Sequence, residues 1–492
     1  MSSRKTIALS IAVSFVEWTT FKIIYPRPDF RGDSYLYIAG AREHLNINIL
    51  STGYSKFLEF LPFLTHSGIG LVTFQFIILE LSIYYFYHIL INQYKMNKET
   101  KISLFLFLFC NPLFLYTSNY VAPDALILAL SLFWFSEILQ ILQKTASYNK
   151  IFFVGVTLSL IFAFGEGVII FLIASIASLI ISKQDRIKKI IGATLLFLFV
   201  FSFITYSRYN IKSLLGKPET SLLANWQIAN NALYVRGQIS IDKKELPTNA
   251  CRILDSISNL FFQKLGPGFN TYLNRYEGDY FLQNKNAPLY TFIKTQSRIQ
   301  DIKTMGLASI TFKDYGQFIV KEHPLAFLWF YAWPNLRHYF KPTLGNLSTY
   351  NQGSDTIRSL GKTWFAYNDN HTNSKVENDL QSSILQIFPY VFLAINILLL
   401  PSCLASALTT KRLSHSHPTK KLYFTLCFYA TYCFLSITKS AASLSKELFI
   451  FTILFSLIAL LIEAMNFGIV HQKQLKIEKK HPKFKIENPK FG

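Results

Sequence analysis

The feature that most constrains this chain is a series of apolar runs, each about as long as a lipid bilayer is thick. A helix needs about 20 apolar residues to cross the hydrocarbon core, and roughly 17 to 25 are tolerated. Runs of this kind lie near residues 6–25, 68–91, 102–118, 122–142, 151–164, 168–182, 190–206, 385–406, 422–438 and 447–469. The sequence therefore predicts an all-α polytopic membrane protein with about ten transmembrane helices.

The composition excludes several other classes of protein. Only 16% of the residues are charged, whereas a soluble chain carries about a quarter. The net charge of +21 comes from basic residues that separate the apolar runs, without a basic domain, so nucleic acid is not an expected partner. The five cysteines include no C-x-x-C spacing, and the chain contains no Walker A, G-x-S-x-G or H-E-x-x-H motif. ATP-driven transport and metalloprotease chemistry are therefore not expected.

The lysines and arginines between the runs predict the orientation, because cytoplasmic loops carry an excess of them. They lie before the first run and near residues 95–101, 144–150, 183–189, 411–421 and 470–492. All of these segments fall on one side of the membrane if residues 151–182 are broken into two helices at the Gly-Glu-Gly turn, residues 165–167. We therefore expect both termini in the cytoplasm and a multi-pass protein of the inner (plasma) membrane, with an uncleaved first helix as its anchor.

These spans divide the chain into four parts. We expect an N-terminal transmembrane module at 1–206 with its first outer loop at 26–67, a large outer-face region of mixed structure at 207–384, C-terminal transmembrane helices at 385–469 and a basic cytoplasmic tail at 470–492. The outer-face region contains an aromatic-rich run at 323–342, which Pro334 interrupts. Because Trp and Tyr prefer the headgroup level, this run is expected at the membrane interface.

The first outer loop carries two carboxylates, Asp29 and Asp33, soon after the first span. From Asp33 onward the pattern becomes helical, with Tyr35, Ile38 and Arg42 on one face. A short helix along the membrane surface would hold the Asp33 carboxylate at its N-terminus, over the membrane. Two interpretations stay open here: Asp33 takes part in catalysis, or it only caps this helix, as Asp does well.

Four further residues are candidates for function. Asp124 follows Pro123 at the start of an apolar helix, where the helix dipole favours an anion, so it either caps or acts chemically. Glu166 lies at a turn within an apolar run, where an ionisable group is a functional candidate unless the headgroup region solvates it. Lys439 and Lys446 flank an outer turn, where they either contact a lipid phosphate or extend along apolar surface toward water.

The order of these features resembles the GT-C superfamily of integral-membrane glycosyltransferases, which includes protein O-mannosyltransferases and the aminoarabinose transferase of lipid A. The matching stretch is D-x-x-x-Y-x-x-x-A, formed by Asp33, Tyr37 and Ala41, and Gly53 and Tyr54 follow before the next apolar run. An acidic residue at the junction of the third and fourth helices, here Asp124, also matches. The resemblance covers residues 1–200, and the rest of the chain shares only the layout.

This resemblance implies transfer of a sugar, with inversion, from a polyprenyl-phosphate carrier to a glycan, lipid or protein acceptor on the outer face. It implies Asp33 as the general base, with Asp29 or Asp124 as helper. In relatives an adjacent acidic pair is common, whereas Ser34 follows Asp33 here. No cofactor is established, and a divalent metal stays open. The residues expected to bind substrate are Tyr37, Arg42, Tyr54, Glu166, Lys439 and Lys446.

Two other functions stay open. A flippase or transporter of a lipid-linked substrate would carry several ionisable residues deep within its spans, and only Glu80 lies in the middle of a predicted span. A non-catalytic membrane subunit would use its large outer region to bind a partner.

Overall fold

The computed structural model describes residues 3–463, with gaps at 95, 144–146, 166, 168, 267–277, 297–301, 343–346, 348, 377–378, 411–416 and 440–445. Within these described residues the chain is almost entirely helical, and pairing between extended segments is limited to two isolated β-bridges. The basic tail at 470–492 lies outside the described residues.

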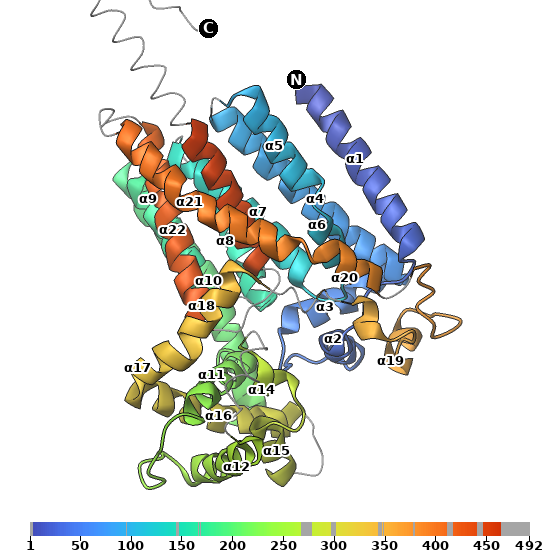
Figure 1. The fold of residues 1–492 in the computed structure, drawn as a ribbon, viewed down its shortest axis with the longest axis vertical. Helices are drawn as coiled ribbons and strands as arrows, with labels where there is room; N and C mark the ends of the chain where they lie inside the picture. The colour runs from blue at the N-terminus through green and yellow to red at the C-terminus, as the bar shows by residue number, and fades with distance from the viewer. Residues whose placement is uncertain are drawn as a thin grey trace, which may run out of the picture.

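Most of the helices form one bundle (Figure 1). They are α1 (Ser3–Ile24), α4 (Gly68–Gln93), α5 (Lys98–Phe109), α6 (Pro112–Asn119), α7 (Asp124–Gln143), α8 (Tyr148–Ala163), α9 (Ile169–Ile181), α10 (Arg186–Leu215), α21 (Phe388–Thr410), α22 (His417–Lys439) and a last helix at 446–463. Within the described part of the chain, six helical segments are long and apolar enough to cross a membrane. This supports a multi-pass α-helical membrane protein. A helix lies in each of the ten expected ranges, but the number of spans stays a prediction.

Two of the apolar runs are interrupted. The expected break within 151–182 is confirmed, because α8 ends at Ala163 and α9 begins at Ile169. Gly165 has a φ of 112°, a conformation that glycine adopts without steric cost. A second break, between α5 and α6, was not expected. Pro112 begins α6, where its missing N–H is tolerated, and the Asn111 side chain accepts a hydrogen bond from the Leu113 N–H at 3.1 Å.

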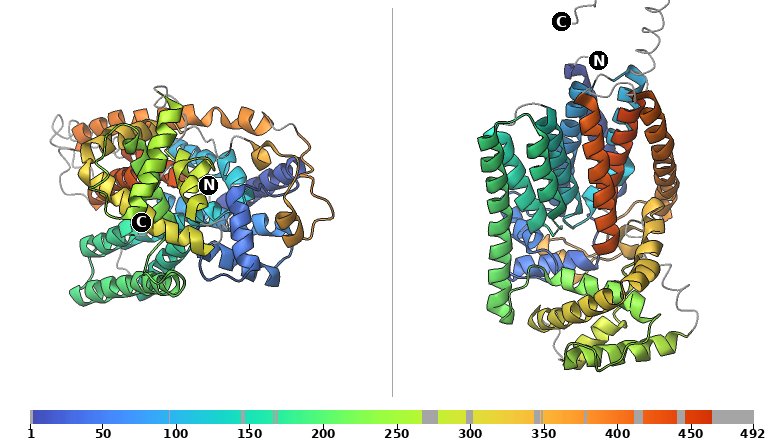
Figure 2. Two further views of the ribbon diagram at one scale, coloured as in Figure 1. Left: turned by 90° about the horizontal axis from the view of Figure 1, so that it is seen from below. Right: turned by 90° about the vertical axis from the view of Figure 1, so that its left-hand side faces the viewer.

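Two short helices lie across the end of the bundle that is opposite the N-terminus of α1 (Figures 1 and 2). These are α2 (Gly32–Arg42) and α3 (Thr52–Phe60). The α3 helix continues into a 3₁₀ turn at Leu61–Phe63 that leads to α4. Both helices bury one side: Tyr35, Ile38 and Leu58 belong to a core that they share with α4 and α7. The expected short helix at Asp33 is therefore present, and its position along the membrane surface stays a prediction.

A separate helical domain extends beyond α2 and α3 (Figure 2). We call its members the distal helices: α11 (Leu222–Arg236), α12 (Asn249–Leu265), α14 (Tyr280–Gln283), α15 (Pro288–Gln296) and α16 (Ile302–Glu322). They have their own apolar core and a buried ion pair, Arg236 Nε to Asp255 Oδ1 at 2.6 Å. The described part of 207–384 consists of helices joined by loops and includes one isolated β-bridge, Thr356 to His371. The α10 helix leads into this domain, because it continues past the expected end at 206 to Leu215.

The chain returns to the bundle through the aromatic-rich run. It forms α17 (Pro324–Phe327), a π-helical turn at Leu328–Ala332 and α18 (Trp333–Phe340), and α18 contacts α21 and α22. Trp329 and Trp333 are exposed, and the run is not among the membrane-crossing segments. Between this run and α21 lie three short helical pieces, Tyr350–Gly353, α19 (Ser359–Trp364) and α20 (Asp379–Leu385), and α19 packs against α2.

Candidate functional site

The connector between α1 and α2, residues 25–31, is held against two distant segments. The Asp29 N–H donates to the Asn119 carbonyl at 2.8 Å, and the Val121 N–H donates back to the Asp29 carbonyl at 3.0 Å. This parallel bridge fixes the connector beside the α6–α7 link, and Asp124 begins α7 directly after that link. The two loops that carry the predicted acids therefore lie together.

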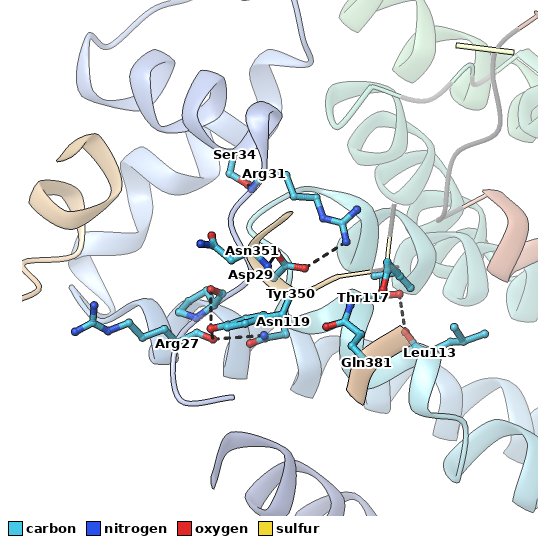
Figure 3. A network of polar contacts seen from close by, with 12 residues as sticks. Arg27, Asp29, Arg31, Ser34, Leu113, Thr117, Asn119, Tyr350, Asn351 and Gln381 are labelled. Atoms are coloured by element: carbon cyan, nitrogen blue, oxygen red, sulfur yellow. Dashed lines mark hydrogen bonds and ion pairs between the residues drawn. The ribbon is translucent and has the colours of Figure 1, made fainter. Parts of the chain in front are cut away.

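Asp29 is enclosed within this connector (Figure 3). Its residue surface is only 2% exposed, and its carboxylate pairs with Arg31 Nη2 at 3.3 Å. The Asn351 N–H donates to Asp29 Oδ1 at 2.9 Å. Burial raises the pKa of Asp29, and the Arg31 charge and the Asn351 N–H oppose that shift. Asp29 therefore holds three segments together and offers no open surface to an acceptor.

Arg31 is a residue that the sequence analysis did not identify. Its side chain is 7% exposed and lies over the Tyr120 ring at 4.8 Å. Only Nη2 makes a hydrogen bond, to Asp29, and the buried Nε has no partner within the described residues. The sequence feature that could have identified Arg31 is the D-F-R-G-D order, because it puts a cation two residues from each carboxylate.

Asp33 differs from Asp29 in almost every respect. It is the second residue of α2, and its residue surface is exposed. Arg31, not Asp33, occupies the N-cap position, and the Arg31 N–H donates to Ser34 Oγ at 3.0 Å. Within the described part of the chain, the Asp33 carboxylate makes no hydrogen bond. The capping interpretation of Asp33 is therefore not supported.

The electrostatic surroundings of Asp33 raise its pKa. The main cause is desolvation, followed by the Asp124 charge, and the Arg31 charge opposes both. The Asp33 residue has solvent-exposed surface, but many protein atoms lie within a wider radius of its carboxylate. These atoms reduce the solvation of the charged form, so exposure and desolvation are compatible here. Asp124 is half-buried in the first turn of α7 and also raises the pKa of the buried Tyr54. The structure thus brings Asp33, Asp124 and Arg31 into one electrostatically coupled cluster.

One of the distal helices, α15, lies within electrostatic range of this cluster. Burial raises the pKa of Tyr290 in α15, and the Asp33 charge adds to that rise. Tyr290 donates from its hydroxyl to the Leu282 carbonyl at 2.7 Å and packs edge-on against Trp226 at 5.4 Å. The start of α2 is therefore near enough to α15 for the Asp33 charge to act on Tyr290. No local sequence pattern joins Asp33 to Tyr290, so the sequence analysis missed this neighbour.

Tyr37 and Tyr54 support the site from behind. Both are buried, and their rings meet edge-on at 5.0 Å. The Tyr54 hydroxyl donates to Gln75 Oε1 at 2.7 Å, and Gln75 Nε2 donates to the carbonyls of Ser118 and Tyr120 at 2.9 Å each. These bonds connect α3 and α4 to the α6–α7 link. The geometry therefore gives these tyrosines a positioning role rather than an open surface for substrate.

The other expected residues lie elsewhere. Arg42 is exposed at the far end of α2 and pairs with Glu43 at 3.3 Å. Glu166 and the Lys439 side chain lie outside the described residues, and Lys446 is half-buried at the start of the last helix. A search of the described residues finds no group of three or more His, Cys, Asp and Glu side chains that could hold a metal ion.

Comparison with known proteins adds no assignment. No protein-family model matches this chain, and neither a curated protein nor a solved structure matches it. A functional proposal therefore depends on the cluster around Asp33.

Proposed function

We propose that this chain is a membrane glycosyltransferase that moves a sugar from a polyprenyl-phosphate carrier to an acceptor on the outer face of the plasma membrane. One observation carries the proposal. The Asp33 carboxylate belongs to an exposed residue at the start of α2, without a hydrogen-bond partner in the described chain, and its pKa responds to a second acid, Asp124, and to the buried Arg31 guanidinium. This is the arrangement that a general base needs beside an anionic leaving group.

In the proposed reaction, Asp33 removes the proton from an acceptor hydroxyl. The resulting oxygen attacks the anomeric carbon, the bond from that carbon to the phosphate oxygen breaks, and polyprenyl phosphate leaves with the electron pair. One displacement inverts the anomeric configuration. The raised pKa of Asp33 favours this role, because a more basic carboxylate accepts the proton more readily.

Arg31 would stabilise the leaving phosphate. Its guanidinium is already desolvated, and Nε has no partner within the described residues. A cation in such surroundings stabilises developing negative charge more strongly than one in water. Asp29 then acts through Arg31, because the 3.3 Å ion pair holds the guanidinium over Tyr120. We therefore assign Asp29 a positioning role and not that of the base.

Asp124 is the second carboxylate of the site. Its negative charge keeps the pKa of Asp33 high, and its side chain can orient sugar hydroxyls. Together the two acids supply oxygen ligands of the kind that hard divalent cations prefer, and such an ion would offset phosphate charge. The proposed roles of Asp33 and Arg31 do not depend on it.

The experiment that tests the proposal is Asp33→Asn. This change removes the base and keeps the side-chain size, so we expect transfer from a panel of polyprenyl-phosphate hexoses to fall by about 10²–10⁴-fold. The melting temperature should stay near that of the parent. Asp185→Asn makes the same chemical change at the N-cap of α10, remote from α2, and should keep full activity. Full transfer by Asp33→Asn would refute the assignment of the base.

The alternative of a lipid-linked substrate transporter depends on acids within the spans. Glu80 accepts a hydrogen bond from Ser14 Oγ at 2.6 Å, and Glu137 accepts one from the Tyr85 hydroxyl. Each bond joins two helices, which favours a packing role over a path for substrate. Movement of a labelled donor across vesicles without its cleavage would support the transporter instead, and partner binding without either activity would support a non-catalytic subunit.

A further inference from the structure

The side of α2 that carries Asp33 continues into a recess. Asp33, Leu36, Gly40 and Glu43 follow one another at i, i+3, i+7 and i+10, the spacing of neighbours along a helix. The last three line a recess of about 620 Å³. Its other walls are the segment after α2, the end of α10 and the start of α16. The recess therefore begins one helical turn from the proposed base.

The walls of this recess are mostly aliphatic. Leu36, Ile47, Leu214 and Met305 line it, and Glu43 is exposed at its edge. Leu36 keeps 42% of its surface exposed, so its side chain is accessible to a bound molecule. The volume lies within the ~300–1,000 Å³ that is usual for small-molecule sites. Such a site suits the apolar part of an amphipathic molecule.

The order of groups along α2 indicates which substrate uses the recess. Inversion requires the acceptor oxygen and the leaving phosphate on opposite sides of the anomeric carbon. Arg31, the proposed partner of the phosphate, is the N-cap residue before α2, and the recess begins three residues after Asp33, at Leu36. At about 1.5 Å of rise per residue, Gly40 lies roughly 10 Å beyond Asp33. A molecule in the recess therefore approaches Asp33 from the C-terminal direction of α2, whereas Arg31 belongs to the segment before this helix.

We propose that this recess binds the aliphatic part of an amphipathic acceptor, whose hydroxyl reaches Asp33. The inference rests on the proposed function and adds to it the class of acceptor. If the recess held the lipid chain of the donor instead, the leaving phosphate and the acceptor hydroxyl would lie on the same side of the anomeric carbon. Inversion does not allow that arrangement.

Binding can be measured independently of catalysis. The probe is n-hexyl glucoside, and methyl glucoside is the control that lacks the alkyl chain. A Met305→Cys variant in nanodiscs carries a bimane label, and a labelled parent protein gives the background from the native cysteines. The matched control is Leu307→Cys, on the same helix, 46% exposed and outside the recess lining. We expect a saturable emission change at position 305 with the hexyl probe only. Equal responses at both positions, or none at 305, would overturn the proposal.

A kinetic experiment separates the recess from the reaction. Leu36→Trp and Met305→Trp should raise the KM for hexyl glucoside by about tenfold or more, and Leu307→Trp should not. Hydrolysis of the donor by water needs no acceptor site, so its rate reports on the donor site alone, and Leu307→Trp should leave it unchanged. If Leu36→Trp and Met305→Trp reduced donor hydrolysis as much as transfer, the recess would be assigned to the lipid chain of the donor. If the KM for hexyl glucoside stayed unchanged, the recess would have no role in acceptor binding. Either result would overturn the proposal. Absence of donor turnover in the parent would instead refute the proposed function, and the labelling result would still decide whether the recess binds the probe.

Discussion

Two charges act on Asp33 in opposite directions, and this balance can be tested. Asp124 raises the pKa of Asp33, in addition to the larger effect of desolvation, and Arg31 lowers it. A base works in its deprotonated form, so activity is lost as the pH falls through its pKa. The raised pKa therefore places the acid limb of kcat/KM above the ordinary Asp value of about 3.9.

Asp124→Asn should move this acid limb to lower pH. The substitution removes the like charge that disfavours ionisation of Asp33, so its pKa falls and the base stays active in more acidic solution. The measurement is the pH dependence of kcat/KM for both proteins, with Asp185→Asn as control. The rate itself should also fall, because Asp124 contacts substrate in the proposed site. If the acid limb of kcat/KM stayed at the same pH in Asp124→Asn, a group other than Asp33 would control the pH dependence.

Asp29 and Asp33 should differ sharply in their effect on stability. Asp29→Ala leaves Arg31 buried without its ion-pair partner and removes the acceptor of the Asn351 N–H. Breaking a buried pair in this way typically costs about 3–5 kcal/mol. Thermal unfolding should therefore show a clearly lower melting temperature for Asp29→Ala and almost no change for Asp33→Ala. Equal melting temperatures would remove the positioning role of Asp29.

At the scale of elements, close packing between α3 and α8 holds the surface helices on the bundle. A Cβ atom at Gly53 would lie 2.6 Å from the carbonyl carbon of Ala163, which is backbone and cannot rotate away. Gly53 follows the D-x-x-x-Y-x-x-x-A stretch in the sequence, and its neighbour Tyr54 supports the α6–α7 link through Gln75. Movement of α3 would therefore disturb the site from behind.

Gly53→Ala should destabilise the protein although alanine normally favours a helix. Overpacking of this kind costs about 1–3 kcal/mol, which exceeds the usual gain of roughly 0.5–1 kcal/mol from replacing a helical glycine. Gly32→Ala is the matched control, because a Cβ atom there meets nothing within 4 Å. Denaturation of the two variants should show a loss only for Gly53→Ala, and a gain for both would contradict the packing argument.

At the scale of the whole molecule, the site depends on orientation. The cluster around Asp33 lies at the end of the bundle where the distal helices extend (Figure 2). The basic loops predict that this end faces outward. An acceptor outside the cell reaches Asp33 only with this orientation.

Cysteine labelling on intact cells tests this arrangement. Lys285→Cys, exposed between α14 and α15, should react with a membrane-impermeant maleimide. Lys183→Cys, exposed between α9 and α10, should react only after the cells are opened. The parent protein gives the background from its own cysteines, of which Cys251 in the distal helices is buried. The reverse pattern would place Asp33 in the cytoplasm and exclude an outer-face reaction.

The sequence by itself determined the helical architecture of the membrane bundle, because this architecture follows from local properties of the chain. These properties are apolar runs long enough to cross a bilayer and the glycine turn that breaks one of them. The break before α9 was predictable for this reason. The break at Asn111 could not be predicted in this way. The apolar run continues across Pro112, and a proline at the first position of a helix does not by itself show that a helix ended before it. The sequence also placed Asp33 at the start of a short helix.

Only the tertiary structure distinguished the two acids of the first loop. Asp29 and Asp33 are the same residue type four positions apart. The N–H of Asn351, from a distant part of the chain, binds Asp29, whereas the residue surface of Asp33 stays exposed and its charge acts on Tyr290. Solvation and pKa depend on which segments lie nearby, and long-range packing decides that. Arg31 stayed unrecognised for the same reason, because its value as a phosphate partner comes from burial against Tyr120, which no local pattern encodes.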